Sequence, residues 1–303
     1  MLNDAIGGFS AGVLGTIIGY PLDTIKTRMQ TSNLGTMMNV TKEMARVEGW
    51  RGFYKGVTLP LLSLTILNTL NFTSFNFWWR VLQPQTEGTF PTSSQQPHLP
   101  SIFLAGALAG PIASIISTPE HFIKTQMQID NTRSSPLFKN GSLAAAKTLY
   151  SSTNSIRVFY IGHASNTLRE SIFLGLYFTS YQALRTVIVN NTNLDQAAIP
   201  FAGGIAGALA WVGSFPLDNI KANVMSDYVM MKHSSSTTTN KPKPFTHISK
   251  SMITTGKKIL HEKGVAGLYK GVQPSLIRAF LVSGSRFTAY EVAVSFMEGL
   301  NKP

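Results

Sequence analysis

Long uncharged runs are the feature of this sequence that most restricts its fold. Four of them have 18 to 23 residues: Ala5–Leu22, Val57–Trp79, Leu99–Thr118 and Gln196–Leu217. A helix needs about 20 apolar residues to cross the hydrocarbon core of a bilayer. A soluble helix would carry a polar stripe at helical spacing, whereas Val57–Trp79 has no charged residue. These runs therefore predict transmembrane helices.

Two further apolar segments, Val158–Leu184 and Gly271–Met297, are interrupted by charge. The charged residues are Arg169 and Glu170 in the first segment, and Arg278, Arg286 and Glu291 in the second. With these two segments the sequence predicts six membrane-spanning helices. Only 13% of the residues are charged, about half the usual share, which agrees with a chain that is largely embedded in lipid.

The net charge of +12 is concentrated in three stretches that alternate with the hydrophobic pairs. Lys26–Lys55, Lys124–Arg157 and Lys221–Lys270 hold 20 of the 26 basic residues, while the connections 81–98 and 186–196 hold none. The positive-inside rule then places both termini on one side of the membrane and the three basic loops on the other. A nucleic-acid-binding protein would instead gather its basic residues on one face, so we expect no nucleic-acid partner.

Several function classes find no support in the sequence. There is no cysteine, which excludes disulfides, thiolate metal sites and a catalytic Cys. We find no nucleophile triad, no metal-ligand spacing and no Gly-rich phosphate loop, so we expect no enzyme activity, no metal and no cofactor. The N-terminus carries no basic or Arg-rich leader, and any import signal is expected to be internal.

Three blocks of the sequence are related to one another. Each has two glycines 13 and 9 residues before a proline, and a lysine five residues after it. The prolines are Pro21, Pro119 and Pro216, spaced 98 and 97 residues apart. A second element follows each block and ends in Gly56, Gly162 or Gly271. Repeats of this kind predict an architecture built from copies of one unit.

The segment 21–30 reads Pro-x-Asp-x-x-Lys-x-Arg-x-Gln, and parts of it recur at 119–128 and 216–225. In these motifs the whole chain resembles the mitochondrial carrier family. The resemblance implies an all-α membrane protein: six transmembrane helices in three tandem repeats of about 100 residues around a central cavity, with short matrix-side helices. The expected repeats are 1–97 (helices about 4–30 and 57–81), 98–193 (about 99–128 and 160–187) and 194–303 (about 197–226 and 272–298).

The motif prolines are predicted to bend their helices, because proline removes a backbone hydrogen bond inside a helix. The alternative is that each proline ends its helix. The paired glycines are predicted to allow close packing of helices.

Charged residues near the prolines are expected to pair across the cavity, because an unpaired charge at membrane depth is costly. The resemblance implies a matrix gate of inter-helix ion pairs: Asp23 with Lys124, Asp218 with Lys26, and a third pair involving Lys221. His121 stands where the third acid is expected, and a neutral imidazole can only accept a hydrogen bond from Lys221. Gln30 and Gln128 match the glutamines that brace such ion pairs in the family, whereas Met225, at the same position of the third repeat, cannot do so. We therefore predict a weakened matrix gate. Glu120 is the alternative partner.

The opposite, cytosolic gate departs further from the family pattern. The matching segments are Phe75-Asn76…Trp79, Tyr181-Gln182…Arg185 and Tyr290-Glu291…Val294. Only one acid and one base remain, so hydrogen bonds through Asn76 and Gln182 are the expected substitute.

The substrate site is predicted from the repeats. Seven residues beyond the three repeat glycines stand Ser63, Arg169 and Arg278, which match the contact points of the family. Arg169 and Arg278 can bind a carboxylate, and Glu170 can pair with an ammonium group. A structural Arg169–Glu170 pair is the alternative. Secondary candidates by helical spacing are Thr16, Ser114, Trp211, Asn68, Asn71 and Arg286; Trp211 either stacks on a quaternary ammonium or simply packs.

An acid next to the second contact point resembles the carnitine/acylcarnitine and ornithine carriers. We therefore expect exchange of a basic amino acid or carnitine ester across the mitochondrial inner membrane. A different carboxylate, a nucleotide, or a non-transporting membrane scaffold are the alternatives. The resemblance further implies a monomer with both termini in the intermembrane space and cardiolipin as a possible lipid partner. The polar segment Lys232–Lys243 reads as an insertion without assigned function.

Overall fold

The computed structural model describes residues 2–31, 36–83, 98–130, 141–191, 195–234 and 248–282, and these residues form helices joined by turns. The long helices are α1 (Leu2–Thr31), α4 (Thr58–Leu82), α5 (Leu99–Asp130), α7 (His163–Asn191) and α8 (Asp195–Ser234). A further helix, Val272–Val282, begins where the sixth span is predicted. The short elements are α2 (Met37–Val47), α3 (Trp50–Phe53), α6 (Gly141–Thr153), the 3-10 helix η1 (Ile156–Tyr160) and α9 (Ile248–Leu268).

The helical class predicted from the sequence is confirmed, and most described helix ends lie within four residues of the prediction. The largest difference is at the end of α8, which runs to Ser234 rather than to residue 226. This helix therefore takes up the first residues of the segment interpreted as an insertion. The expected continuation of the sixth span from 283 to 298 lies outside the described residues.

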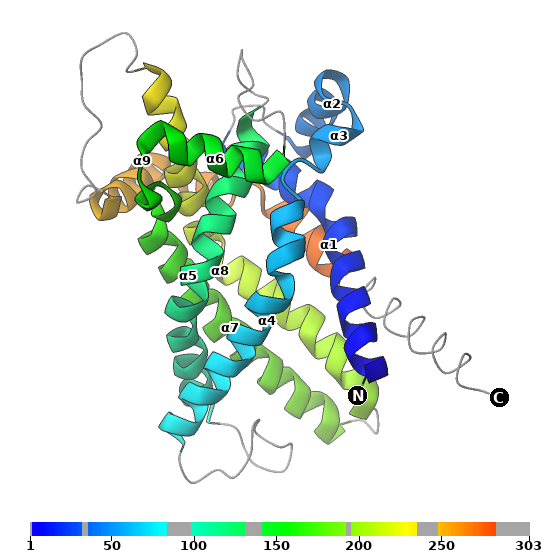
Figure 1. The fold of residues 1–303 in the computed structure, drawn as a ribbon. Coiled ribbons are helices and arrows are strands. Elements are labelled where there is room, and N and C mark those ends of the chain that lie inside the picture. The colour runs from blue at the N-terminus through cyan, green and yellow to red at the C-terminus, as the bar shows by residue number, and fades with distance from the viewer. Residues whose placement is uncertain are drawn as a thin grey trace, which may run out of the picture.

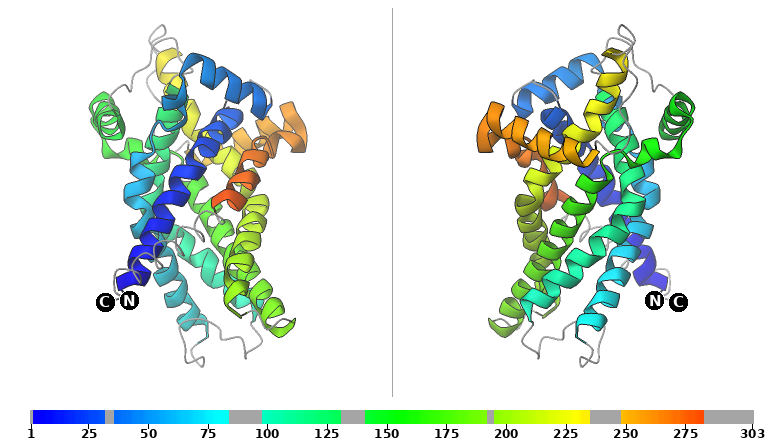
Figure 2. Two further views of the ribbon diagram at one scale, coloured as in Figure 1. Left: turned by 90° about the vertical axis from the view of Figure 1, so that its right-hand side faces the viewer. Right: turned by 90° about the vertical axis from the view of Figure 1, so that its left-hand side faces the viewer.

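The short helices gather at one end of the molecule, here named the short-helix end. Figure 1 shows α2, α3, α6 and α9 at this end and the beginning of α1 at the opposite end. The long helices approach one another near the short-helix end and spread apart away from it (Figure 2). Among the described elements, α5 packs against α4 and α7, and α7 packs against α8.

All three motif prolines lie inside helices. Pro21 is within α1 and Pro119 within α5, and Pro216 is within α8. Each helix continues for at least ten residues beyond its proline. The alternative that the prolines end their helices is therefore wrong, while the bend that each proline is expected to cause stays a prediction.

The distribution of side chains is inverted relative to a soluble protein. Large apolar side chains point outward on the long helices, for example Leu62 (75% exposed) and Phe77 (56% exposed). Charged side chains are buried between the helices, among them Lys26, Arg169 and Asp218. Exposed apolar area on this scale marks a surface that contacts something other than water, and buried charges at membrane depth face a shared interior.

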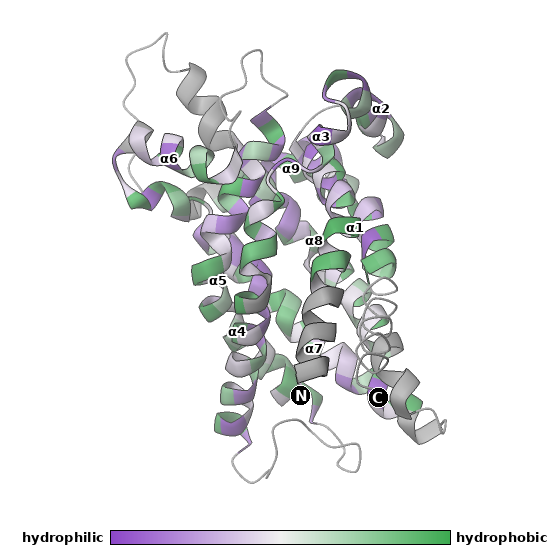
Figure 3. Cartoon of the chain, turned by 45° about the vertical axis from the view of Figure 1, so that its right-hand side comes forward, coloured by the Kyte–Doolittle hydropathy of each residue, from purple (hydrophilic) through white to green (hydrophobic). Residues whose placement is uncertain are grey.

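Hydrophilic residues interrupt the hydrophobic ones along the long helices (Figure 3). By length and apolar composition alone, α5 is the one described helix able to span a membrane by itself. The helical segments Trp50–Ser63 and Ile66–Leu82 meet at a bend of 48°. If this bent pair is taken as one span, it is the second candidate for a membrane-spanning helix. Of the other long helices, α7 carries Arg169 and Glu170 within its apolar segment. The buried positions of these two residues explain why this helix need not be uniformly apolar.

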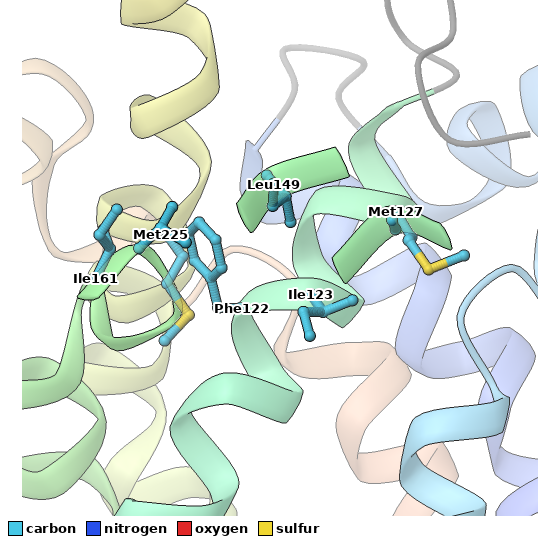
Figure 4. Close-up of a cluster of buried hydrophobic side chains, with 8 residues drawn as sticks. Phe122, Ile123, Met127, Leu149, Ile161 and Met225 are labelled. Atoms are coloured by element: carbon cyan, nitrogen blue, oxygen red, sulfur yellow. The ribbon is translucent and has the colours of Figure 1, made fainter. Parts of the chain in front are cut away.

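Apolar clusters join the short elements to the long helices. In Figure 4, Phe122, Ile123 and Met127 of α5 lie near Leu149, Ile161 and Met225. Met225 stands where the first two repeats have a glutamine; it fills this cluster and is fully buried. A second cluster packs Ile25 and Met29 of α1 against α2 and α3. These contacts hold the short elements against one end of the helical bundle.

The glycine that ends each second repeat element has a steric role. Gly56, Gly162 and Gly271 adopt φ values of 90°, 78° and 90°, which favour glycine. A Cβ atom at Gly56 would lie 3.0 Å from the Tyr20 hydroxyl, and one at Gly162 would lie 3.1 Å from Met225. The repeated glycine therefore lets the chain turn tightly into the even-numbered span of each repeat.

Candidate functional site

A cavity of about 740 Å³ lies between the long helices. Its wall comes from α1, α4, α5, α7, α8 and the helix Val272–Val282, so both spans of every repeat contribute to it. Of the predicted substrate contacts, the wall contains Thr16, Ser63, Asn68, Asn71, Arg169, Trp211 and Arg278.

Three predicted contacts are not found in the wall. Ser114 is buried between α5 and α7, where its hydroxyl lies 2.8 Å from that of Thr167; its expected cavity position is wrong, because it faces the neighbouring helix. Glu170 is buried behind the wall. Arg286 lies outside the described residues.

The two inter-repeat ion pairs expected from the sequence are present. Lys124 Nζ lies 2.8 Å from Asp23 Oδ2, and Lys26 Nζ lies 2.7 Å from Asp218 Oδ2. The first pair joins repeats 1 and 2, and the second joins repeats 1 and 3. Gln30 braces the second pair, since its amide donates to Asp218 over 3.1 Å.

Gln128 acts differently from Gln30. Its amide donates to the Thr24 hydroxyl over 3.1 Å, and its backbone carbonyl accepts from Arg28 over 2.9 Å. These contacts tie Gln128 to α1 and not to a carboxylate of the gate. The expectation that Gln128 braces an ion pair of the gate is therefore wrong.

The third gate contact also differs from the expectation. Lys221 donates to Asn166 of α7 over 3.1 Å and lies 4.0 Å from Asp218. His121 is directed to Glu170, with 3.7 Å between Nε2 and Oε1. The predicted contact between His121 and Lys221 is thus wrong, and Glu120 does not replace it, because Glu120 contacts Ser63.

Asn166 is a site residue that sequence reasoning missed. It is fully buried, and its amide donates over 2.9 Å to both Ser117 and Thr118 of α5 while its carbonyl accepts from Lys221 of α8. The only sequence signal is its position one helical turn before Arg169.

Both arginines of the predicted substrate site contact the carboxylates of the gate. Arg278 Nε lies 2.6 Å from Asp23 Oδ1, and Arg169 Nε lies 3.4 Å from Asp218 Oδ1. Arg169 also pairs with Glu170 over 2.7 Å. The substrate contacts and the gate therefore form one electrostatic network.

Aromatic rings support the cations of this network. The Lys26 ammonium lies 4.0 Å from the centre of the Trp211 ring, and the Arg169 guanidinium lies 4.8 Å from the same ring. Arg169 also lies 4.5 Å from the ring of Phe173. Each such contact stabilises a desolvated cation by about 1–2 kcal/mol. The Trp211 ring thus contacts cations of the protein itself.

Glu120 is a second residue whose role sequence reasoning missed. It lines the cavity with only 9% of its surface exposed, and one of its carboxylate oxygens accepts a hydrogen bond from Ser63. The acid next to the second contact point, Glu170, is held by Arg169 and His121. The acid available in the wall is therefore Glu120.

At the end away from the short helices, aromatic packing dominates. Phe75 and Phe178 stack with ring centres 4.0 Å apart, and Trp79 is buried. Gln182 is 2% exposed, and Asn76 Oδ1 has no hydrogen-bond partner among the described residues. Arg185 forms no ion pair within the described ranges, and Glu291, the one acid that remains in this motif, lies outside them. The closing of this gate through hydrogen bonds of Asn76 and Gln182 stays a prediction.

No group of three or more potential metal ligands occurs in the part of the chain that the structure describes.

Comparison with known proteins gives relatives over nearly the full length. The Arabidopsis thaliana mitochondrial arginine transporter BAC2 is 28% identical, over 95% of this chain and 88% of its own. The human mitochondrial carnitine/acylcarnitine carrier protein is 28% identical over 98% of this chain and 94% of its own. The Drosophila melanogaster mitochondrial magnesium exporter 1 is 27% identical, over 95% of this chain and 92% of its own.

The family model described as "Mitochondrial carrier protein" matches residues 1–86, 95–192 and 195–300. These three matches cover almost the whole sequence and agree with a three-repeat architecture in which a charged cavity lies between the repeats. The chain belongs to the mitochondrial carrier protein family.

Proposed function

We propose that this protein moves an amino-acid-like zwitterion or cation across the mitochondrial inner membrane by alternating access. The observation that carries the proposal is the cavity itself, which all three repeats line and which inter-repeat ion pairs cross. A bundle held together by Asp23–Lys124 and Asp218–Lys26 can open at the short-helix end when these pairs separate. This is the geometry that alternating access requires.

The charges of the wall favour a substrate with a carboxylate. Among the described wall residues, five are basic and three are acidic. The basic residues are Lys26, Lys124, Arg169, Lys221 and Arg278, and the acidic residues are Asp23, Glu120 and Asp218. Arginine binds a carboxylate through two parallel hydrogen bonds, so Arg278 and Arg169 are the proposed contacts.

The arginines also suggest how binding is coupled to opening. A substrate carboxylate that binds Arg278 competes with Asp23 for the same guanidinium, because Arg278 Nε and Asp23 are only 2.6 Å apart. The same competition applies to Arg169 and Asp218. Substrate binding would therefore weaken the network that holds the short-helix end together, as differential binding to two conformations requires.

A basic amino acid fits the wall better than a carnitine ester. The Trp211 ring, which a quaternary ammonium would need, is already covered by Lys26 and Arg169. A nucleotide is disfavoured by Glu120, which would repel its phosphates. Two of the relatives described above are named for arginine and for carnitine or acylcarnitine, and identities near 28% do not choose between such substrates.

We propose the membrane orientation from the charge pattern. The basic loops belong to the short-helix end, which would face the matrix, and both termini would face the intermembrane space. A monomer suffices, because one chain lines the cavity. Anionic lipid such as cardiolipin is the proposed partner of the basic surface at the short-helix end.

The proposal is tested with purified protein in liposomes that contain unlabelled arginine. Uptake of labelled arginine should exceed uptake into empty vesicles, since exchange needs an internal substrate. Arg278→Ala should lower kcat/KM by about 10- to 100-fold, because removal of a charged hydrogen-bond partner costs about 1.5–3 kcal/mol. Arg278→Lys should retain part of the activity.

Arg157→Ala is the matched control, because Arg157 is exposed on η1 and lies outside the cavity. Its uptake should equal that of the wild type. Arginine uptake that is unchanged in Arg278→Ala would contradict the proposed site. Absence of uptake of arginine, ornithine and carnitine by the wild type, with uptake of malate or ATP, would contradict the proposed substrate class.

A further inference from the structure

The acidic residues in and behind the cavity wall differ in how their charge is balanced. Asp23 pairs with Lys124 and Arg278, and Asp218 pairs with Lys26 and Arg169. Glu170 pairs with Arg169 and lies 3.7 Å from His121. Glu120 forms no ion pair with any residue that the structure describes, and its hydrogen bond comes from a neutral hydroxyl, that of Ser63.

The basic residues of the described wall are all engaged with other partners. Their contacts are Lys26–Asp218 at 2.7 Å, Lys124–Asp23 at 2.8 Å, Arg278–Asp23 at 2.6 Å, Arg169–Glu170 at 2.7 Å and Lys221–Asn166 at 3.1 Å. A carboxylate that is 91% buried and lacks a cation is costly at membrane depth. Glu120 therefore provides an acceptor that a cation from outside the protein can neutralise.

We propose that Glu120 and Ser63 form an acidic subsite that binds the side-chain cation of a basic amino acid. This inference rests on the proposed function and specifies the substrate class. The Ser63 hydroxyl donates to Oε2 of Glu120 and fixes the orientation of the carboxylate. Oε1 makes no hydrogen bond within the described ranges and can accept one from a guanidinium or ammonium group. The cavity then offers arginines to the substrate carboxylate and one acid to its cation.

The adjacent residue does not compete for this role. His121 lies against Glu170, whose charge Arg169 already balances. Both positions line the cavity, but Glu120 contacts Ser63 of α4, whereas His121 lies against Glu170 of α7. Glu120 and Glu170 both belong to the second repeat, but their environments differ. Glu170 lies beside the cation of Arg169, whereas Glu120 contacts only the neutral hydroxyl of Ser63.

Arginine and citrulline are the matched ligands for the test, because they have nearly the same shape and differ in the charge of the terminal group. Wild-type protein in liposomes should exchange arginine with a kcat/KM at least tenfold above that of citrulline. Glu120→Gln should reduce this preference to below threefold by a loss of arginine transport, with citrulline changed by less than threefold. Glu120→Asp should keep a preference for arginine, and Ser63→Ala should reduce it severalfold.

A binding readout accompanies transport. Arginine should raise the Tm of the detergent-solubilised wild type more than citrulline does, and Glu120→Gln should abolish that difference. Glu262→Gln is the control, because Glu262 is exposed on α9 and outside the cavity; it should behave as the wild type. If Glu120→Gln unfolds, Glu120→Asp and Ser63→Ala carry the test through the ratio of arginine to citrulline.

Three results would overturn the inference. The first is an undiminished arginine preference in Glu120→Gln, as expected if Glu120 carries a proton. The second is an equal loss of both substrates, which would mark a structural role. The third is a wild type that exchanges both substrates without preferring arginine. In these cases the proposed function survives, whereas a wild type that exchanges neither amino acid contradicts the proposed function itself.

Discussion

At the residue scale, the contact made by Lys221 is the weakest of the three contacts between repeats. Lys26 and Lys124 each meet a carboxylate of another repeat, whereas Lys221 meets the neutral amide of Asn166. A hydrogen bond between an amide and an ammonium lacks the attraction of a full opposite charge. The gate thus has two strong links and one weaker link, and the weak one joins α7 to α8.

Asn166→Asp should strengthen this link. The cation is already buried, so a carboxylate about 3 Å away adds attraction without burying a further lysine. Ser117, which accepts from the Asn166 amide, can rotate its hydroxyl and donate instead, whereas the Thr118 hydroxyl already donates to the Ser114 carbonyl. We expect stabilisation of about 1 kcal/mol, a rise in Tm of about 2–4 °C and slower exchange.

The measurement is thermal unfolding of the purified protein together with the exchange rate in liposomes. The Lys221→Met single variant and the Asn166→Asp/Lys221→Met double variant complete a double-mutant cycle, in which Asn166→Asp should give no gain once Lys221 is absent. A Tm at or below that of the wild type in Asn166→Asp would count against the assignment of Asn166 as the third gate contact.

The sequence alone predicts the strong links but not the weak one. The pairs Asp23–Lys124 and Asp218–Lys26 are implied by the resemblance of the repeated motif to that of the carrier family, and the structure contains both. The partner of Lys221 depends on how α7 and α8 are rotated against each other, and no residue pattern specifies that rotation. Glu170 and Glu120 illustrate the same limit. Whether a carboxylate can bind a substrate cation depends on whether a basic side chain of the protein already lies beside it, and the sequence does not show this.

At the element scale, glycines with the same spacing have different surroundings. A Cβ on Gly110 of α5 would lie 2.4 Å from the backbone nitrogen of Ser171 in α7, and one on Gly106 would lie 2.7 Å from the carbonyl oxygen of Leu174. At Gly207 of α8 a Cβ would meet no atom of the described residues within 4 Å. Within the part of the chain that the structure describes, the glycine pair of α5 therefore packs closely against α7, whereas Gly207 of α8 has no such close neighbour.

Gly110→Ala should consequently lower stability, by about 1–3 kcal/mol, because two backbones must move apart. Gly207→Ala is the matched control, with the same substitution at the equivalent repeat position. It should be neutral or stabilising by up to about 1 kcal/mol, because alanine favours the helix. Thermal unfolding measures both variants, and equal destabilisation of the two would refute the difference between the helices.

At the scale of the whole molecule, three copies of a helical pair enclose polar groups that a single pair could not bury. The uncharged runs and the repeated motif predict the helices to within a few residues, because lipid thickness and proline position restrict them strongly. The end of α8 at Ser234 was not predicted, because the repeated motif ends at Met225 and the last residues of the helix, from Lys232, belong to the polar segment. Which predicted site residues actually line the cavity also required the structure, as Ser114 shows.

The central claim is that the cavity is a pathway reached from the two sides of the membrane in turn. The chain contains no cysteine, so single cysteines can be introduced without a background signal. Leu67 lines the cavity, while its neighbour Ile66 is 53% exposed on the surface of the same helix and lies outside the cavity wall. Leu67→Cys and Ile66→Cys therefore form a matched pair.

The decisive measurement is the labelling of these two variants in liposomes by a membrane-impermeant thiol reagent, applied from one side at a time. The account predicts that Leu67→Cys reacts from the side away from the short helices, and from the short-helix side only during substrate exchange. Ile66→Cys should react slowly from both sides, because lipid covers it. Equal labelling of the two cysteines, or labelling of Leu67→Cys from one side regardless of exchange, would contradict the account.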